Sequence, residues 1–73
     1  MATFAERLKE LRTAKGNTQK DMAELLEMKT ERTYRKYEAG TIDPPTSKTE
    51  FLADFFEVSI DYLLGRSDTP ERK

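Results

Sequence analysis

Short stretches with helical periodicity, three of them followed directly by a glycine, limit the folds open to this 73-residue chain. In the first stretch, Phe4, Leu8 and Leu11 recur at the spacing of an α-helix, and Gly16 follows as a stop signal. Similar patterns predict helices over residues 4–15, 19–26, 31–39, 47–56 and 60–64. Because no stretch alternates as a strand would, we expect an all-α fold of five short helices.

Polar residues stand where these helices should begin. The cap candidates are Thr3, Thr18, Thr30 and Ser59. Glu6 and Asp21 follow the first two by three residues, which is the capping-box pattern. Residues 40–45, GTIDPP, contain two successive prolines, which break a helix. We therefore expect a loop between the first three helices and the last two.

The chain contains no cysteine and no histidine. Common zinc ligands, a thiol nucleophile and an imidazole base are thus missing, so we expect neither an enzyme nor a metal or cofactor site. No small-molecule ligand is indicated. Apolar runs are only a few residues long and no signal-like leader follows Met1, so we expect no membrane segment and a cytoplasmic location.

The net charge of −1 does not suggest a nucleic-acid-binding protein, because phosphate attraction favours a basic domain. The charge is distributed unevenly, however. Residues 1–16 carry +2, residues 17–40 are balanced, and residues 41–73 carry −3. A molecule with its acidic half turned away from DNA would reconcile the two observations.

The second and third predicted helices are separated by a short turn, as in a helix-turn-helix. On a helical wheel of about 100° per residue, the third helix divides into two arcs. The inner arc holds Thr30, Thr33, Tyr34 and Tyr37, and the outer arc holds Arg32, Arg35, Lys36 and Ala39, with Glu31 and Glu38 at the border. The tyrosines should pack in the core, leaving the basic residues for a partner. Alternatively, the outer arc is only a solvated face in which Glu31 compensates Arg35.

Three segments carry a more specific pattern: FAERLKELRTAKGNTQKDMAELL, TYRKYEAG and FLADFFEVSIDYLLGRSD. Together they resemble the phage-repressor and Cro-like family of helix-turn-helix proteins, also called the xenobiotic-response-element family. The resemblance extends over residues 4–68 and implies a lambda-repressor-like domain that we place at residues 1–68. The remaining residues, 69–73, have no apolar anchor and should form a disordered tail.

The resemblance also implies a set of DNA contacts. In that family the third helix enters the major groove and the start of the second helix grips phosphate. By position, the implied base or groove contacts are Thr30, Glu31, Arg32 and Lys36. The implied phosphate contacts are Arg35 and, at the start of the second helix, Thr18, Gln19 and Lys20. Arg12 and Glu38 resemble a structural ion pair that the family forms between its first and third helices.

The sequence departs from the family in two places that bear on these contacts. The turn EMKT, residues 27–30, is one residue longer than usual and has Glu27 in place of the customary glycine. This leaves open whether Thr30, Glu31 or Arg32 leads into the groove. The loop after the third helix offers Asp43 but no basic residue before Lys48.

The function that this pattern favours is sequence-specific binding of double-stranded DNA by a transcriptional regulator, most simply a repressor of the phage or mobile-element type. A homodimer on a two-fold operator is expected, because one small domain makes few contacts. The alternative is a helix-turn-helix fold used as a protein-interaction module, an antirepressor or adaptor, which the acidic balance would suit. Phe51, Phe55 and Phe56 should be core residues rather than a ligand pocket, with one of them open to a second subunit.

Overall fold

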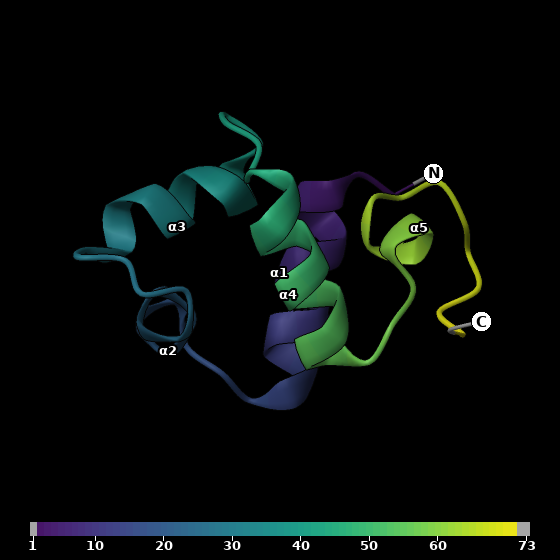
Figure 1. Cartoon of the computed structure of the whole chain (residues 1–73), viewed down its shortest axis with the longest axis horizontal. Helices are drawn as coiled ribbons and strands as arrows, with labels where there is room; N and C mark the ends of the chain where they lie inside the picture. The colour runs from purple at the N-terminus through teal and green to yellow at the C-terminus, as the bar shows by residue number, and fades with distance from the viewer. Residues whose placement is uncertain (1, 72–73) are drawn as a thin grey trace.

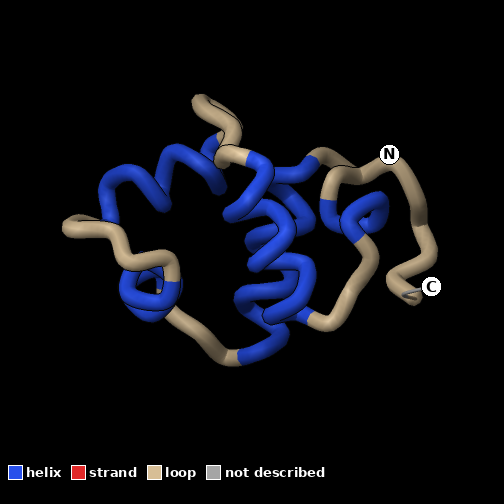
Figure 2. The backbone as a smooth tube through the Cα atoms, viewed as in Figure 1, coloured by secondary structure: helices blue, strands red, loops and turns tan. Residues whose placement is uncertain are grey.

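Five α-helices make up most of residues 2–71, the part of the chain described by the computed structural model (Figure 1). They are α1 (Phe4–Lys15), α2 (Gln19–Leu25), α3 (Glu31–Ala39), α4 (Thr46–Phe56) and α5 (Ile60–Leu63). These residues contain no strand (Figure 2). The all-α prediction is confirmed, and every predicted helix boundary lies within one residue of the observed boundary.

The capping residues explain why the helices begin where they do. Thr3 and Glu6 form a complete capping box, in which the Glu6 N–H donates to Thr3 Oγ1 and the Thr3 N–H donates to Glu6 Oε1. Thr18 and Asp21 repeat this arrangement at the start of α2. Thr30 occupies the N-cap position of α3, but its side chain makes no cap hydrogen bond. Both predicted capping boxes are therefore confirmed.

Each helix places one large, fully buried side chain in the core. These side chains are Leu8, Met22, Tyr34, Leu52 and Leu63. Helix α3 packs against α1 and α2, whereas α5 packs against α1 and α4. As a result, α2 and α3 lie at one end of the molecule and α5 lies at the other (Figure 1).

The phenylalanines of α4 divide between core and surface. Phe56 is buried and Phe55 is half-buried, whereas the Phe51 ring stacks on Phe55 and stays 41% exposed. Phe56 is in the core as expected, and Phe51 is the one of the three phenylalanines that is exposed. Phe51 lines a depression between α2 and α4. That a second subunit covers Phe51 stays a prediction.

Arg7 fixes the segment that follows α5, a role that the sequence pattern did not reveal. Its buried guanidinium donates to the backbone oxygens of Tyr62 and Ser67 and to Asp68 Oδ1, the last at 3.0 Å. It also lies 3.8 Å above the centre of the Tyr62 ring. Further along, the Ser59 N–H donates to Pro70 O. Residues 72–73 of the expected tail lie outside the described residues.

Glu57 ends α4 in a left-handed backbone conformation, with φ of +56°. A side chain is disfavoured there, and glycine removes the steric penalty while adding some entropy to the unfolded chain. We expect Glu57→Gly to raise the free energy of unfolding by about 0.5–1 kcal/mol in urea titrations. Glu10→Gly, placed inside α1, is the matched control and should lower the free energy of unfolding by about 1 kcal/mol. A Glu57→Gly protein less stable than the wild type would show that the Glu57 side chain stabilises the fold.

Candidate nucleic-acid interface

Helices α2 and α3 form a helix-turn-helix whose turn is closed by backbone hydrogen bonds. The Leu26 N–H donates to Met22 O at 3.0 Å, and the Met28 N–H donates to Ala23 O at 2.8 Å. Glu27, between them, adopts a left-handed conformation with φ of +55°. This is the position at which the sequence has glutamate in place of glycine. Glu27 therefore has the backbone conformation that glycine adopts most easily. The remaining residues of the turn, 28–30, lie in the loop at the outer edge of the molecule (Figure 2).

Two tyrosines attach α3 to the rest of the protein. Tyr34 is fully buried and Tyr37 is nearly so, and their rings meet edge to face with centres 6.3 Å apart. The prediction that Thr30 and Thr33 join this inner arc is wrong, because both are exposed. Thr30 has an extended backbone, so the helical wheel does not apply to it, and Thr33 lies outside the narrow stripe that the tyrosines define.

The opposite side of α3 is an exposed basic surface formed by Arg32, Arg35 and Lys36, hereafter the basic face. Arg35 Nη2 donates to Glu31 Oε2 at 3.0 Å, one helical turn away. Within residues 2–71, Arg32 and Lys36 form neither an ion pair nor a side-chain hydrogen bond. Their charges are therefore fully available to an external anion.

An ion pair between α1 and α3 fixes the orientation of this face. Arg12 Nε donates to Glu38 Oε2 at 2.6 Å, and Arg12 Nη2 donates to Glu38 Oε1 at 3.1 Å. The Glu38 side chain is only 4% exposed. Burial alone would raise the pKa of Glu38, but Arg12, the Tyr34 hydroxyl and the Gln19 amide outweigh it and hold the pKa below its ordinary value. Glu38 is therefore an ionised carboxylate with a partner for its charge.

The predicted phosphate-contact residues at the start of α2 lie in different environments. Lys20 is exposed, and the Thr18 hydroxyl accepts from the Asp21 N–H while keeping its own proton to donate. The Gln19 side chain turns inward, and its Nε2 donates to Glu38 Oε1 at 3.2 Å. Gln19 thus links the start of α2 to the ion pair, and its backbone N–H is the group that remains free near the surface.

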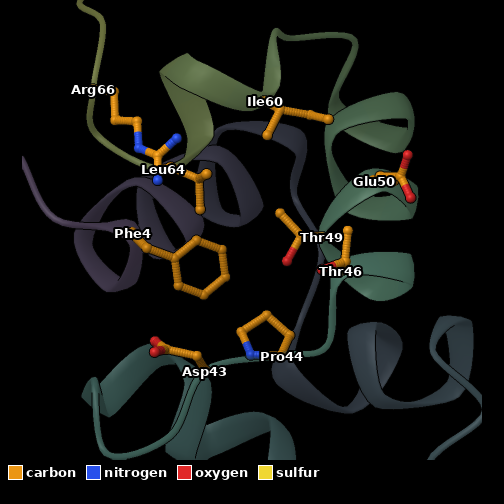
Figure 3. A pocket seen from close by; sticks show the side chains of 9 residues that line it. All are labelled: Phe4, Asp43, Pro44, Thr46, Thr49, Glu50, Ile60, Leu64 and Arg66. Atoms are coloured by element: carbon orange, nitrogen blue, oxygen red, sulfur yellow. The ribbon is translucent and has the colours of Figure 1, made fainter.

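A cavity of about 410 Å³ lies away from the basic face, between the N-terminal part of α1, the loop before α4, and α5 (Figure 3). The rings of Phe4 and Pro44 face into it, and Asp43, Glu50 and Arg66 stand at its rim. None of the residues predicted to contact DNA lines it. Two carboxylates beside one arginine make the cavity an unfavourable site for phosphate.

Residues 2–71 contain neither a metal-binding cluster nor a membrane-spanning helix. No three acidic side chains lie together in a geometry that could hold a metal ion. No described helix has the length and hydropathy needed to cross a bilayer.

Comparison with known proteins shows which family and which proteins the chain is similar to. The family model described as helix-turn-helix matches residues 8–63. Among curated Bacillus subtilis (strain 168) proteins, the chain is 37% identical over 70 residues to the uncharacterized HTH-type transcriptional regulator YobD. It is 43% identical over 61 residues to the SPbeta prophage-derived uncharacterized HTH-type transcriptional regulator YonR. It is 36% identical over 70 residues to the HTH-type transcriptional regulator ImmR.

These alignments cover 96%, 84% and 96% of the present chain, respectively. They cover only 62%, 56% and 54% of the three relatives. The chain thus spans little more than half the length of these relatives.

Proposed function

This chain belongs to the helix-turn-helix family, and we propose that it regulates transcription by binding double-stranded DNA with α3 in the major groove. The observation that carries the proposal is the basic face. Arg32 and Lys36 stand exposed and unpaired within residues 2–71, on a helix whose other side is held by two buried tyrosines. A recognition helix needs both properties, because it must be rigidly held and must keep its donors free.

The remaining contacts follow from the arrangement of α2 and α3. The residues proposed to contact base edges or the groove are Thr30, Glu31, Arg32 and Lys36. Arg35 is proposed to contact a phosphate or a base. The Thr18 hydroxyl, the Gln19 backbone N–H and the Lys20 ammonium are proposed to contact the DNA backbone, where groups at a helix start favour an anion. Arg12 and Glu38 orient α3 and do not touch DNA.

The proposed working form is a cytoplasmic homodimer that acts as a repressor. A single domain of this size supplies few phosphate contacts, so two copies on half-sites about 34–36 Å apart would provide the affinity of a specific regulator. The prophage origin in the name of YonR supports a repressor of the phage or mobile-element type.

The test is the salt dependence of duplex binding by the wild-type chain, measured by fluorescence anisotropy. Lys20, Arg32, Arg35 and Lys36 are the basic groups of the proposed surface. If two to four of them reach phosphates, the logarithm of the binding constant should fall with the logarithm of salt concentration with a slope of about −2 to −4. No binding to any duplex at low salt would contradict the proposal.

A protein-interaction module is the second candidate function, and one observation favours it. Leu25 and Phe51 are both exposed and line the same depression between α2 and α4. Exposed apolar side chains that cluster in this way are common at protein interfaces. This function would give no salt-dependent binding to duplex DNA, so the same titration separates the two candidates.

A further inference from the structure

Glu31 places a carboxylate at the edge of the basic face. It is the first residue of α3, and its side chain is one-third exposed. A negative charge at a helix start stabilises the free helix, but next to a phosphate backbone it is repelled. On a DNA-reading helix, a carboxylate in this position is tolerable where a base edge offers it a hydrogen-bond donor.

The pairing of Glu31 with Arg35 leaves both groups with free hydrogen-bonding capacity. Their bond uses Glu31 Oε2 and Arg35 Nη2, 3.0 Å apart. Among the described residues Glu31 Oε1 has no hydrogen-bond partner, and no other acceptor takes the remaining Arg35 donors. An ionised carboxylate only accepts and a guanidinium only donates. The pair therefore presents an acceptor beside a donor at the surface of the helix.

The base edges in the major groove differ in what they offer to such a pair. Cytosine presents the N4 amino donor, and the guanine paired with it presents the O6 and N7 acceptors. Thymine presents an oxygen acceptor and a methyl group, which a carboxylate cannot match. An adenine–thymine pair also sets a donor, adenine N6, beside the acceptor thymine O4, but it offers a guanidinium only that one oxygen on the thymine. Guanine offers two acceptors, O6 and N7, to the Arg35 donors that Glu31 leaves free. A cytosine–guanine pair therefore matches Glu31 and Arg35 better than an adenine–thymine pair.

We propose that Glu31 and Arg35 act together as the reader of one cytosine–guanine base pair in each half-site. The Glu31 carboxylate accepts from cytosine N4, and the Arg35 guanidinium donates to the guanine of the same base pair. The hydrogen bond between the two side chains is kept and holds them in register. This inference rests on the proposed function and adds to it the base pair that α3 selects.

The experiment is selection of bound sequences from a random duplex pool, performed with the wild type, Glu31→Ala and Glu31→Gln. The wild type should enrich cytosine at one position, at which any other base lowers affinity about tenfold. Glu31→Ala should weaken the preference at that position alone, because only the Arg35 contact with guanine remains, and should bind mismatched duplexes at least as tightly as the wild type. Glu31→Gln should shift the preference to adenine, since an amide pairs with adenine N6 and N7.

Glu10→Gln is the matched control, because it removes one exposed carboxylate from α1 and should leave the selected sequence unchanged. Circular dichroism of each variant reports whether α3 is still folded, and the near-isosteric Glu31→Gln retains the test if Glu31→Ala is unstable. Identical base preferences in the wild type and both Glu31 variants would overturn this inference and leave the proposed function intact. Failure of the wild type to enrich any duplex would overturn both.

Discussion

Replacing Arg12 by alanine is expected to lower the free energy of unfolding by about 3 kcal/mol, because it leaves the Glu38 carboxylate buried without its partner. Glu38 is 4% exposed, and it receives two hydrogen bonds from Arg12 and one from Gln19. Gln19 alone offers no positive charge to replace the one removed. Urea unfolding followed by circular dichroism measures the loss.

The pH dependence of this loss identifies its cause. In the wild type the pKa of Glu38 lies below its ordinary value, so the pair contributes stability above that ordinary value and loses it as the pH falls through the lowered pKa. Without Arg12, burial dominates and raises the pKa of Glu38 above the unfolded-state value. The variant should then be nearly as stable as the wild type in acid, and the difference should grow as the pH rises towards 7.

Arg35→Ala is the control for this prediction. It also removes an arginine from an ion pair with glutamate, but its side chain is 61% exposed, so the change in stability should stay below about 0.5 kcal/mol. A loss for Arg12→Ala that is equally small, or that is constant with pH, would show that the buried pair does not stabilise the fold.

Replacing Arg32 and Lys36 together by alanine is expected to weaken duplex binding by about 2–4 kcal/mol without unfolding the protein. Both side chains are exposed and unpaired within residues 2–71, so their removal costs no internal contact. In the proposed complex both side chains lie in the major groove, where they contact base edges and their charges attract the flanking phosphates. Anisotropy titrations of the two proteins with one duplex measure the difference, and thermal unfolding checks that both are folded.

The double replacement of Lys9 and Arg66 by alanine is the matched control. It removes one lysine and one arginine, both exposed, from α1 and from the segment after α5. If binding depended only on net charge, both double variants would lose affinity equally. We expect the control to bind within a factor of about three of the wild type, because neither residue lies on α2 or α3.

The fold was predictable to the extent that it follows from local rules. Thr3 and Thr18 indicate helix starts because their side-chain hydroxyls cap backbone N–H groups, and Gly16 indicates a helix end because glycine adopts the left-handed conformation found there. The spacing of Tyr34 and Tyr37 indicates the buried side of α3. Local rules did not predict burial where it depends on the packing of one helix against another. Phe51 has the pattern of a core residue and remains exposed because the depression between α2 and α4 is open to solvent.

One feature of the fold and one feature of the candidate site could not be predicted from the sequence. The sequence pattern suggests that Arg7 is an exposed charge, and only the contacts with the segment after α5 show why it is buried. The family resemblance predicts that Gln19 contacts phosphate, and only the hydrogen bond to Glu38 shows that the Gln19 side chain faces inward. Both depend on contacts between residues far apart in the sequence, which helical periodicity does not specify.

The most direct measurement of whether the basic face of α3 contacts DNA is the salt dependence of duplex binding by the wild type and the Arg32/Lys36 double variant, side by side. Each basic side chain that is removed from the groove reduces the number of counterions that the protein releases from the DNA on binding. The measured quantity is the slope of a plot of the logarithm of the binding constant against the logarithm of salt concentration. We predict that this slope becomes shallower by about 1 to 2 in the Arg32/Lys36 double variant and stays unchanged in the Lys9/Arg66 control. Equal slopes for the wild type and the Arg32/Lys36 variant would contradict a DNA-binding role for this face.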